Sequence, residues 1–348
     1  MTRLRESVTT VSIADDADSA PVAAPAPGAY PNGFNLLIVG SDTGEGQGAL
    51  GTGRDTELND VNLLVHVSAD HDEAAVVSIP RDLVVPVPTC TDDGVARPAQ
   101  LAAALNTTLA AGGLPCTVRT VEALTGLDIQ FASLVTFAGV IRMSDAVGGV
   151  PVCLATGIDD EYTGFTRAAG THVLSGGDAL AFLRSRHGVG DGGDLTRISA
   201  QQVFLSSLVR TLSSERVTDD AIATLRLAQA AVDNMLLSTE LADPDTMAAV
   251  INALGSVAPE RFTFVQYPGM TGMDGVYEGK VAPIQAQAAA LFEAIEADDP
   301  FRLAAVGDGR GSVADPGVAV ASVSASAGDV LVGLRGQTAA DQTCAVGR

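Results

Sequence analysis

Short apolar runs of β type alternate with helical patterns along most of this chain, and this alternation limits the folds that it can adopt. The run at 34–39 is largely apolar and ends in Gly-Ser-Asp, as expected for a buried strand that leads into a loop. Similar runs predict strands at 61–67, 74–79, 131–136, 150–154 and 262–266, and helical periodicity predicts helices at 98–111, 117–125, 137–147, 196–213, 218–237, 244–255 and 283–296. Strands that alternate with helices predict the α/β class, here an α-β-α sandwich with a central mixed sheet flanked by helices.

Composition divides the chain into three parts. Residues 1–33 are expected to be a leader and linker, because 20–28 is rich in Pro and Ala. Residues 34–297 carry the alternating pattern and are expected to form the main domain. Residues 298–348 are rich in Gly, Ala, Ser and Val with weak periodicity, and are expected to form a C-terminal tail.

Acidic residues dominate the charged side chains. The chain has 42 Asp and Glu against 20 Lys and Arg, which gives a formal net charge of −22. Nucleic acid is therefore excluded as a partner, because binding to a phosphate backbone needs an extended basic surface. No apolar stretch reaches the roughly 18–20 residues that a membrane span needs, and residues 1–18 lack the apolar core of a signal peptide.

Four cysteines, Cys90, Cys116, Cys153 and Cys344, occur without the spacing of a metal site. They allow three disulfide pairings, or four reduced and buried thiols. We expect disulfides, because Cys344 lies in a polar terminal region where a buried thiol has no role. The favoured pairing joins Cys90 to Cys116, which bracket one helical segment, and Cys153 to Cys344, which would tether the tail. Disulfides predict a location outside the cytoplasm, with the export signal upstream of residue 1.

Three arginines lie close together in and after the motif Arg-Ser-Arg-His-Gly, in spite of the acidic composition. Arg184 and Arg186 are two residues apart and can face the same way only if the chain is extended, so the preceding helix is expected to end near Arg184. Arg197 and Gln201 are four apart and share one face of the next helix. Guanidinium groups set among glycines are typical of phosphate or pyrophosphate binding, and a solvated basic turn is the alternative. His187 is interpreted either as a general base or as a structural residue.

Acidic side chains stand where the predicted strands begin or end. Asp42 follows one strand, Arg81 and Asp82 follow another, and Asp60 precedes the strand at 61–67. Ligands bind at strand ends in open α/β sheets, so these loops are expected to converge on one site. Asp42 and Asp60 offer hard oxygen ligands, which together with substrate phosphates suit Mg²⁺. The alternative for any single aspartate is a turn cap.

Several multi-residue motifs occur in a fixed order within residues 34–296. They are Asn35-Leu-Leu-Ile-Val-Gly-Ser-Asp42, Val77-Ser-Ile-Pro-Arg81-Asp82, the segment from Val118 through Thr125-Gly126, Ala146-Val-Gly-Gly-Val150, and Ala179-Leu-Ala-Phe-Leu-Arg184-Ser-Arg186-His-Gly with Arg197 and Gln201. In this combination the chain resembles the LytR-CpsA-Psr family, in its actinobacterial type. The resemblance implies an extracytoplasmic, usually membrane-anchored phosphotransferase of Gram-positive cell walls. Such a transferase moves a glycopolymer, for example a teichoic acid, from a polyprenyl-pyrophosphate carrier to a muramic-acid hydroxyl of peptidoglycan and releases polyprenyl phosphate.

The resemblance also implies roles for individual residues. Asp42 and Asp60 would hold Mg²⁺, and Asp82 or Asp42 would accept the proton of the attacking hydroxyl. The apolar residues of 101–154, which otherwise indicate ordinary core, would in part line a tunnel for the lipid tail. The pyrophosphate would be held by Arg81, Arg184, Arg186 and Arg197, with Gln201 completing the head-group pocket.

The chain departs from the family pattern at two points. The family commonly has Arg-Ser-Asp-Thr before its second strand, and the matching residues here run from Leu58 to Val61, so that Asp60 is kept and the arginine is replaced by Leu58. Arg54, a few residues upstream, is expected to reach the same place from the loop. The membrane anchor is also absent from this sequence.

Two other functions stay open at this stage. One is a secreted polyprenyl-pyrophosphate phosphatase, in which water takes the place of the glycan acceptor. The other is a non-enzymatic wall protein that binds lipid or glycan. Asp42, Asp60 and the arginines at motif positions disfavour the second alternative, since binding alone does not require metal carboxylates.

Overall fold

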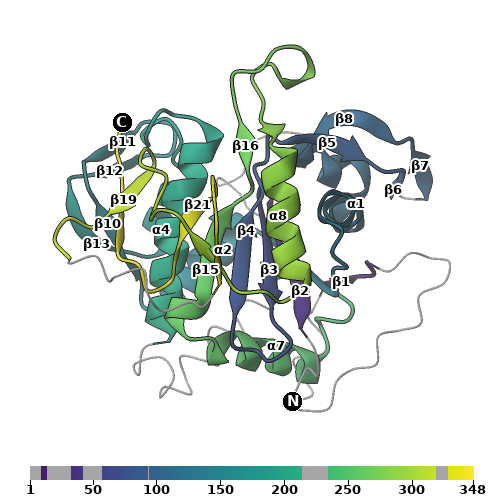
Figure 1. Cartoon of the computed structure of the whole chain (residues 1–348), viewed down its shortest axis with the longest axis horizontal. Helices are drawn as coiled ribbons and strands as arrows, with labels where there is room; N and C mark the ends of the chain where they lie inside the picture. Colours follow the sequence, from purple (N-terminus) through teal and green to yellow (C-terminus); the bar gives the residue numbers. More distant parts are fainter. Residues whose placement is uncertain (1–8, 14–32, 42–56, 93, 214–233, 319–327) are drawn as a thin grey trace.

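A mixed sheet runs through the centre of the structure (Figure 1). The computed structural model describes residues 9–13, 33–41, 57–92, 94–213, 234–318 and 328–348. Within these residues the sheet has eight strands, in the order β1 (Thr9–Val11), β14 (Met235–Ser238), β9 (Phe131–Val135), β2 (Phe34–Ser41), β3 (Asn59–Val67), β4 (Ala74–Ser78), β15 (Phe262–Gln266) and β21 (Arg335–Thr338). β2 pairs parallel with β9 and antiparallel with β3, and β4 pairs parallel with β15, so the predicted mixed sheet is confirmed.

Helices cover both faces of this sheet. α1 (Thr108–Thr125) and α8 (Gln285–Glu296) pack on one face, where Leu37 and Val39 join their side chains in a buried cluster. α4 (Asp194–Leu212) and α7 (Pro244–Ser256) pack on the other face, where Leu36 is buried. Because successive side chains of a strand point to opposite faces, a nearly continuous apolar run fits a strand that is covered on both sides. The predicted α-β-α sandwich is therefore confirmed.

A second, smaller sheet packs on α4. Its order is β13 (Gly170–Leu174), β10 (Val150–Leu154), β22 (Thr343–Ala345) and β19 (Ser312–Ala314). Phe182 of α3 (Gly176–Arg184) and Phe204 of α4 lie in one buried cluster with Val150 and Val152 of this sheet. α4 is therefore a shared element that touches both sheets.

Shorter elements connect these layers. They are α2 (Phe137–Ala146), the 3₁₀ turns η3 (Leu105–Thr107), η4 (Pro259–Arg261) and η5 (Gly275–Tyr277), and the strand pairs β5 (Val84–Val87) with β8 (Gln100–Ala104), β6 (Cys90–Asp92) with β7 (Val95–Arg97), β11 (Ile158–Asp160) with β12 (Phe165–Arg167), β16 (Gly269–Met270) with β17 (Ala282–Pro283), and β18 (Phe301–Leu303) with β20 (Asp329–Leu331). In Figure 1, β5 to β8 lie at the upper right, and the hairpin that begins with β16 rises to the top of the molecule.

The predicted helix at 98–111 is wrong over most of its length. Residues 100–104 form β8, which pairs antiparallel with β5, and α1 begins only at Thr108. The segment is rich in Ala and therefore favours a helix locally, but pairing with β5 overrides this weak preference. The predicted helix at 218–237 lies mostly outside the described residues, and its end, from Met235, is strand β14.

Both terminal regions contribute strands to the sheets. Within the expected leader, β1 pairs parallel with β14. Within the expected tail, β21 pairs antiparallel with β15, and β22 pairs parallel with β10. These strands are three or four residues long, too short to show a hydrophobic period in the sequence.

The apolar residues of 101–154 include much of the main core. Leu105, Leu109, Val118 and Val121 are each at most 4% exposed and pack with the sheet and α8 in one cluster. The ordinary-core interpretation is confirmed for these residues, and the lipid tunnel stays a prediction. No helix among the described residues combines the length and the hydropathy that a membrane span requires.

Both favoured disulfides are present. Cys90 is bonded to Cys116, and Cys153 is bonded to Cys344, at Cα–Cα distances of 5.4 and 4.4 Å. The second bond joins neighbouring strands, because Cys153 and Cys344 are register partners in β10 and β22.

Replacing Cys153 and Cys344 together with Ala is expected to lower the free energy of unfolding by about 2–4 kcal/mol, because the bond constrains the unfolded chain over a sequence separation of 191. Urea denaturation followed by circular dichroism measures this change. The control is the variant without Cys90 and Cys116, whose separation of 26 predicts a cost smaller by about 1–2 kcal/mol. A loss below about 1 kcal/mol for the first variant would contradict the expected tether.

Candidate active site

One edge of the main sheet collects the ends of several strands. Ser41 at the end of β2 is the register partner of Asn59 at the start of β3, and the parallel strands β4 and β15 end together at Ser78 and Gln266. The first turn of α4 lies over this edge, because Gln266 Nε2 donates a hydrogen bond of 2.8 Å to the carbonyl oxygen of Leu195. The predicted convergence of strand-end loops is confirmed for the loops that carry Asp60, Arg81 and Asp82, and the loop that carries Asp42 lies outside the described residues.

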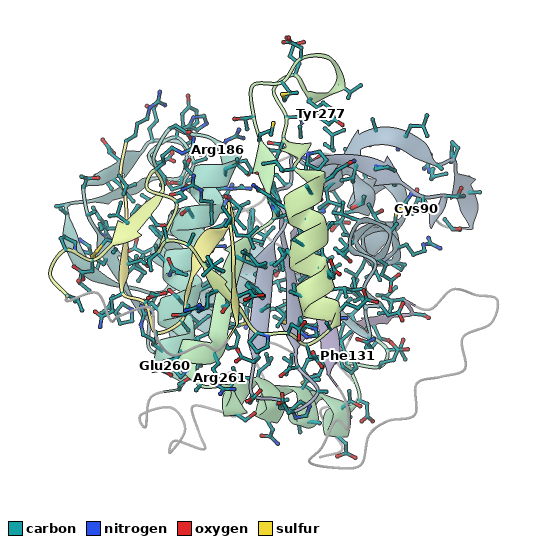
Figure 2. The ribbon with its side chains drawn as sticks, viewed as in Figure 1. Cys90, Phe131, Arg186, Glu260, Arg261 and Tyr277 are labelled. Atoms are coloured by element: carbon teal, nitrogen blue, oxygen red, sulfur yellow. A yellow bond between two sulfur atoms is a disulfide. The ribbon has the colours of Figure 1, made fainter. Side chains whose placement is uncertain are left out.

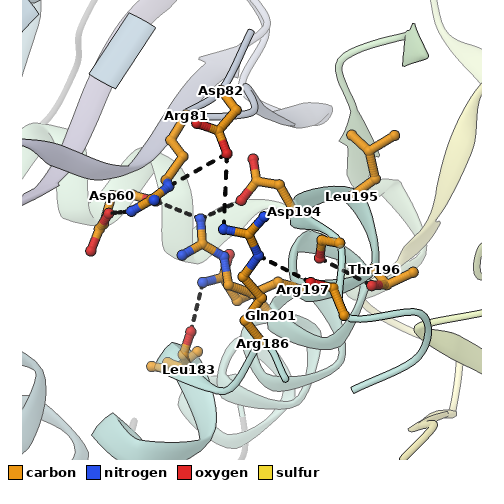
Figure 3. Close-up of polar contacts among 12 residues, drawn as sticks. Asp60, Arg81, Asp82, Leu183, Arg186, Asp194, Leu195, Thr196, Arg197 and Gln201 are labelled. Carbon is orange, nitrogen blue, oxygen red and sulfur yellow. Dashed lines mark hydrogen bonds and ion pairs between the residues drawn. The ribbon is translucent and has the colours of Figure 1, made fainter. Parts of the chain in front are cut away.

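Arg81 stands between two carboxylates at this edge (Figure 3). Its Nη1 donates to Asp60 Oδ1, and its Nε lies 3.8 Å from Asp82 Oδ2. Arg186 Nη1 lies 4.0 Å from the same Asp82 oxygen, and Figure 2 shows Arg186 at the end of the molecule opposite Arg261. Burial acts to lower the pKa of Arg81, but the negative charges of the neighbouring aspartates, Asp60 first, outweigh burial and raise that pKa above its ordinary value.

Arg197 and Gln201 lie on the first turns of α4, on the face that the sequence predicts. Arg197 Nη2 donates to Asp194 Oδ1 at 2.6 Å and to the carbonyl oxygen of Asp60 at 3.0 Å. Gln201 Nε2 donates to the carbonyl oxygen of Leu183 at 2.7 Å, which joins α4 to α3. Arg197 and Asp194 are 6% and 4% exposed, so each offsets part of the cost of burying the other charge.

Arg184 and Arg186 differ in their direct contacts. α3 ends at Arg184, as predicted, and the backbone is extended at Ser185. The Arg184 guanidinium lies over the ring of Phe137 in α2, 4.4 Å from its centroid. Arg186 instead donates from Nε to the carbonyl oxygen of Gly192 at 3.0 Å and faces Asp82. Arg186 is therefore the member of the pair that joins Arg81 and Arg197 at the sheet edge.

Lys280, the only lysine in the chain, completes the surroundings of Asp82. Its Nζ lies 3.0 Å from Asp82 Oδ1, and the next residue, Val281, donates its backbone N–H to the Asp82 carbonyl oxygen at 3.0 Å. Lys280 stands at the base of the β16–β17 hairpin, far from the other site residues in the sequence. No sequence motif predicts a site role for Lys280, and the only indication in the sequence is that it is the single lysine.

Asp160 is a second residue that the sequence does not single out, and it shapes the loop that carries Arg186. Its Oδ2 accepts hydrogen bonds from Ser185 Oγ at 2.7 Å and from the backbone N–H groups of Arg186 and Gly188 at 2.9 and 3.0 Å. Its Oδ1 accepts the N–H of Tyr162 at 3.1 Å, and the residue is 1% exposed. Burial acts to raise the pKa of Asp160, but these four hydrogen bonds outweigh burial and lower the pKa below its ordinary value.

The six charged residues that meet at the sheet edge form what we call the arginine–aspartate cluster. Its members are Asp60, Arg81, Asp82, Arg186, Asp194 and Arg197. The Nε atoms of Arg81 and Arg197 are buried and have no hydrogen-bond partner among the described residues. Since buried donors in proteins are nearly always satisfied, this cluster is built to receive an acceptor. Planar N–H donors of this kind match the oxygens of a phosphate group.

Two of the predicted site residues, Asp42 and Arg54, lie outside the described residues. Asp60, the other predicted metal ligand, uses Oδ1 to pair with Arg81. Within the described part of the chain, the one group of three potential metal ligands is Cys153, Asp315 and Cys344, whose sulfur atoms are joined in a disulfide and so are not free to bind metal. The Mg²⁺ site stays a prediction that depends on Asp42.

The chain is similar to cell-wall proteins across most of its length. A family model, described as the LytR_cpsA_psr family, matches residues 5–293. The chain is 30% identical over 269 residues to the cell wall biosynthesis protein LcpA of Corynebacterium glutamicum, which covers 69% of this chain and 51% of LcpA. The chain thus spans about half the length of this curated relative.

Two Bacillus subtilis proteins extend the comparison. The polyisoprenyl-teichoic acid–peptidoglycan teichoic acid transferase TagT is 27% identical over 243 residues, covering 67% of this chain and 69% of TagT. The crystal structure of TagV superposes with a TM-score of 0.61 at 19% identity and covers 77% of this chain and 98% of TagV. At this identity the structural likeness shows a shared fold.

Replacing Asp160 with Asn is expected to lower the free energy of unfolding at neutral pH by about 1–3 kcal/mol, because an amide oxygen accepts weaker hydrogen bonds than a carboxylate. The folded-state pKa of Asp160 is depressed, so its ionisation stabilises the fold fully above the unfolded-state pKa of about 3.9. This stabilisation is lost as the pH falls through the folded-state pKa. Urea denaturation from about pH 7 down to about pH 3 measures the difference between variant and wild type.

The neighbouring exposed Asp159, which accepts a hydrogen bond from Thr166 Oγ1 at 2.7 Å, provides the control variant Asp159→Asn. This control should be within about 0.5 kcal/mol of wild type. A difference for Asp160→Asn that stayed constant down to the lowest pH would show that ionisation is not its cause.

Proposed function

The chain belongs to the LytR-CpsA-Psr family, and from this premise we propose that it transfers a glycopolymer from a polyprenyl-pyrophosphate carrier to peptidoglycan, forming a phosphodiester bond. The relative TagT is named a transferase of teichoic acid between these two classes of molecule. LcpA is named a cell wall biosynthesis protein. Because the chain spans about half of LcpA, the substrates are part of the proposal.

One observation carries the proposal, namely that two buried guanidinium N–H groups of the arginine–aspartate cluster make no hydrogen bond. Arg81 and Arg197 each direct one terminal nitrogen to an Asp60 or Asp194 oxygen, and each keeps a buried Nε without a hydrogen-bond partner among the described residues. A pyrophosphate supplies several anionic oxygens at once and would satisfy them. Three arginines gather at this edge in a chain with a net charge of −22, which favours an anionic ligand there.

The proposed reaction is a single displacement at phosphorus. The hydroxyl oxygen of the acceptor forms a bond to the phosphorus that carries the glycan, and the bond from that phosphorus to the bridging oxygen breaks. The leaving group is polyprenyl phosphate, which takes the bond electrons, and the hydroxyl proton passes to a carboxylate or to water. Most of the catalysis in such a step comes from positioning and from stabilising negative charge.

Arg81, Arg186 and Arg197 fit the charge-stabilising role, because aspartates fix their guanidinium planes before substrate arrives. Asp82 fits a positioning role better than a proton-accepting one. It is 6% exposed, and it lies within ion-pair distance of Lys280, Arg81 and Arg186. In the proposal Asp82 therefore holds three cations at the phosphate.

Mg²⁺ is part of the proposal as a cofactor. Mg²⁺ commonly binds one or two carboxylates and completes its coordination with substrate phosphates and water. Asp60 fits this requirement, because its carboxylate is partly exposed at the sheet edge and its Oδ2 makes none of the contacts described above. Asp42 and Asp60 would hold the ion, which would supply positive charge beside the leaving phosphate.

The proposed location is outside the cytoplasm, at the membrane and wall of a Gram-positive cell. Two disulfides support this location, because such bonds persist mainly in oxidising compartments. The proposed partners are the lipid-linked glycan and peptidoglycan, and the lipid substrate would itself bring the protein to the membrane surface.

Arg186→Ala is expected to reduce transfer about 100-fold or more, because it removes a preorganised cation from the reacting phosphate. Arg184→Ala is expected to impair transfer as well. The assay follows labelled glycan from its lipid carrier into purified peptidoglycan, and thermal unfolding shows that the variants fold. Arg97→Ala is the control, since Arg97 pairs with Asp92 on an exposed hairpin.

The same assay separates the other functions. A phosphatase would release glycan phosphate without any acceptor and ignore added peptidoglycan, and a wall-binding protein would hold the lipid without turnover. Full glycan transfer by Arg186→Ala would refute the proposed site.

Removing divalent metal with a chelator is expected to reduce transfer at least about 10-fold, and added Mg²⁺ should restore it. Asp60→Asn should lower both the rate and the apparent affinity for Mg²⁺ in the same assay. The control is Asp178→Asn, because Asp178 pairs with Arg167 on the surface. Undiminished transfer in chelator would exclude the proposed metal.

A further inference from the structure

We propose that Tyr162 and His187 form a stacking subsite for the first sugar of the donor glycan, next to the pyrophosphate. The inference rests on the proposed function, because it names where the donor sugar lies relative to Arg186. It assigns a recognition role to two residues that are not members of the arginine–aspartate cluster.

The first observation is an exposed aromatic ring in a chain with few aromatic residues. Aromatic residues make up 4% of the sequence, and Trp is absent. Tyr162 is 71% exposed, and it is the one aromatic side chain in the described part of the chain that is largely open to solvent. An exposed, fixed tyrosine is typical of a recognition surface, since its ring offers contact area with little loss of conformational freedom.

The second observation is that Tyr162 is paired with a residue of the Arg186 loop. The ring centroids of Tyr162 and His187 are 4.3 Å apart, with an angle of 40° between the ring planes. His187 is itself exposed and directly follows Arg186 in the chain. The pair therefore lies beside the loop that carries a proposed phosphate-binding cation.

The third observation is that one buried carboxylate fixes both sides of this arrangement. Asp160 accepts the backbone N–H of Tyr162 with one oxygen and the backbone N–H groups of Arg186 and Gly188 with the other. The two loops are also in close contact, because a Cβ atom at Gly188 would lie 2.9 Å from the carbonyl oxygen of Asp159. The backbones of Tyr162 and Arg186 are thus held in a fixed relation, and the Tyr162 ring contacts the ring of His187.

The chemistry of the donor matches this relation. One face of a pyranose ring presents C–H groups, which pack on the electron-rich face of an aromatic ring. In a lipid-linked glycan the first sugar is bonded directly to the pyrophosphate. A phosphate held by Arg186 therefore places that sugar within a few ångströms of the Arg186 guanidinium. In the proposal the neighbouring Tyr162 and His187 receive this sugar, whereas the acceptor sugar carries no phosphate before the reaction.

The test compares two ligands that differ by one sugar. Isothermal titration in detergent micelles measures the binding of a polyprenyl pyrophosphate that carries N-acetylglucosamine and of the same polyprenyl pyrophosphate without sugar. Wild type is expected to bind the sugar-bearing lipid about 3- to 10-fold more tightly, and Tyr162→Ala and Tyr162→Leu should lose this preference. Tyr162→Phe keeps the ring and should keep the preference, while Arg186→Ala should weaken the binding of both lipids.

The outcomes separate this inference from the proposed function. Tight binding of both lipids without discrimination, or a preference that survives in Tyr162→Ala, overturns the sugar subsite and leaves the proposed function intact. Failure of wild type to bind either lipid overturns the proposed function and this inference together. In transfer assays, a Tyr162→Ala variant that raised the KM for peptidoglycan alone would assign the ring to the acceptor and refute the donor subsite.

Discussion

Burial of several guanidinium groups at the edge of one sheet is the constraint from which the rest of the site follows. A charge removed from water must be paired, and the cluster meets this need with aspartates that come from different parts of the chain. Asp60 arrives on β3, Asp82 follows β4, and Asp194 opens α4. Because each aspartate pairs with a nitrogen of an arginine side chain, the other N–H groups of that guanidinium keep fixed directions. The aspartates thereby offset the cost of bringing several guanidinium groups close together.

α4 contacts both sheets and carries two residues of the arginine–aspartate cluster. Its first turn carries Asp194 and Arg197 at the main sheet, and its middle contributes Phe204 to the core of the smaller sheet. The loop before α4 carries Arg186 and is held by Asp160 from β11. A shift of α4 relative to the main sheet would therefore move Asp194 and Arg197 relative to Arg81, which follows β4. Because both sheets pack on α4, this helix keeps its site residues in a fixed position beside the main sheet.

The sequence predicts the parts of this structure that depend on local order. Strand ends, the end of α3 at Arg184 and the shared face of Arg197 and Gln201 follow from apolar runs and residue spacing. β8 was missed because alanine favours a helix locally while β5 supplies a strand partner from a distance. Lys280 and Asp160 were missed for the same reason, since their roles come from contacts across long stretches of chain. The strands of the last fifty or so residues are too short to carry a period.

The pairing of β22 beside β10 has a consequence for the timing of assembly. Gly190 donates its backbone N–H to the carbonyl oxygen of Val346 at 3.0 Å, and Arg348 donates its backbone N–H to the carbonyl oxygen of Gly188 at 2.9 Å. The loop after Arg186 therefore forms backbone hydrogen bonds with residues 346–348. Residues 346–348 are synthesised long after the loop itself. A chain caught midway through synthesis therefore has this loop without its partners in residues 346–348, and only Asp160, which is synthesised earlier, then holds the backbone N–H groups of Arg186 and Gly188.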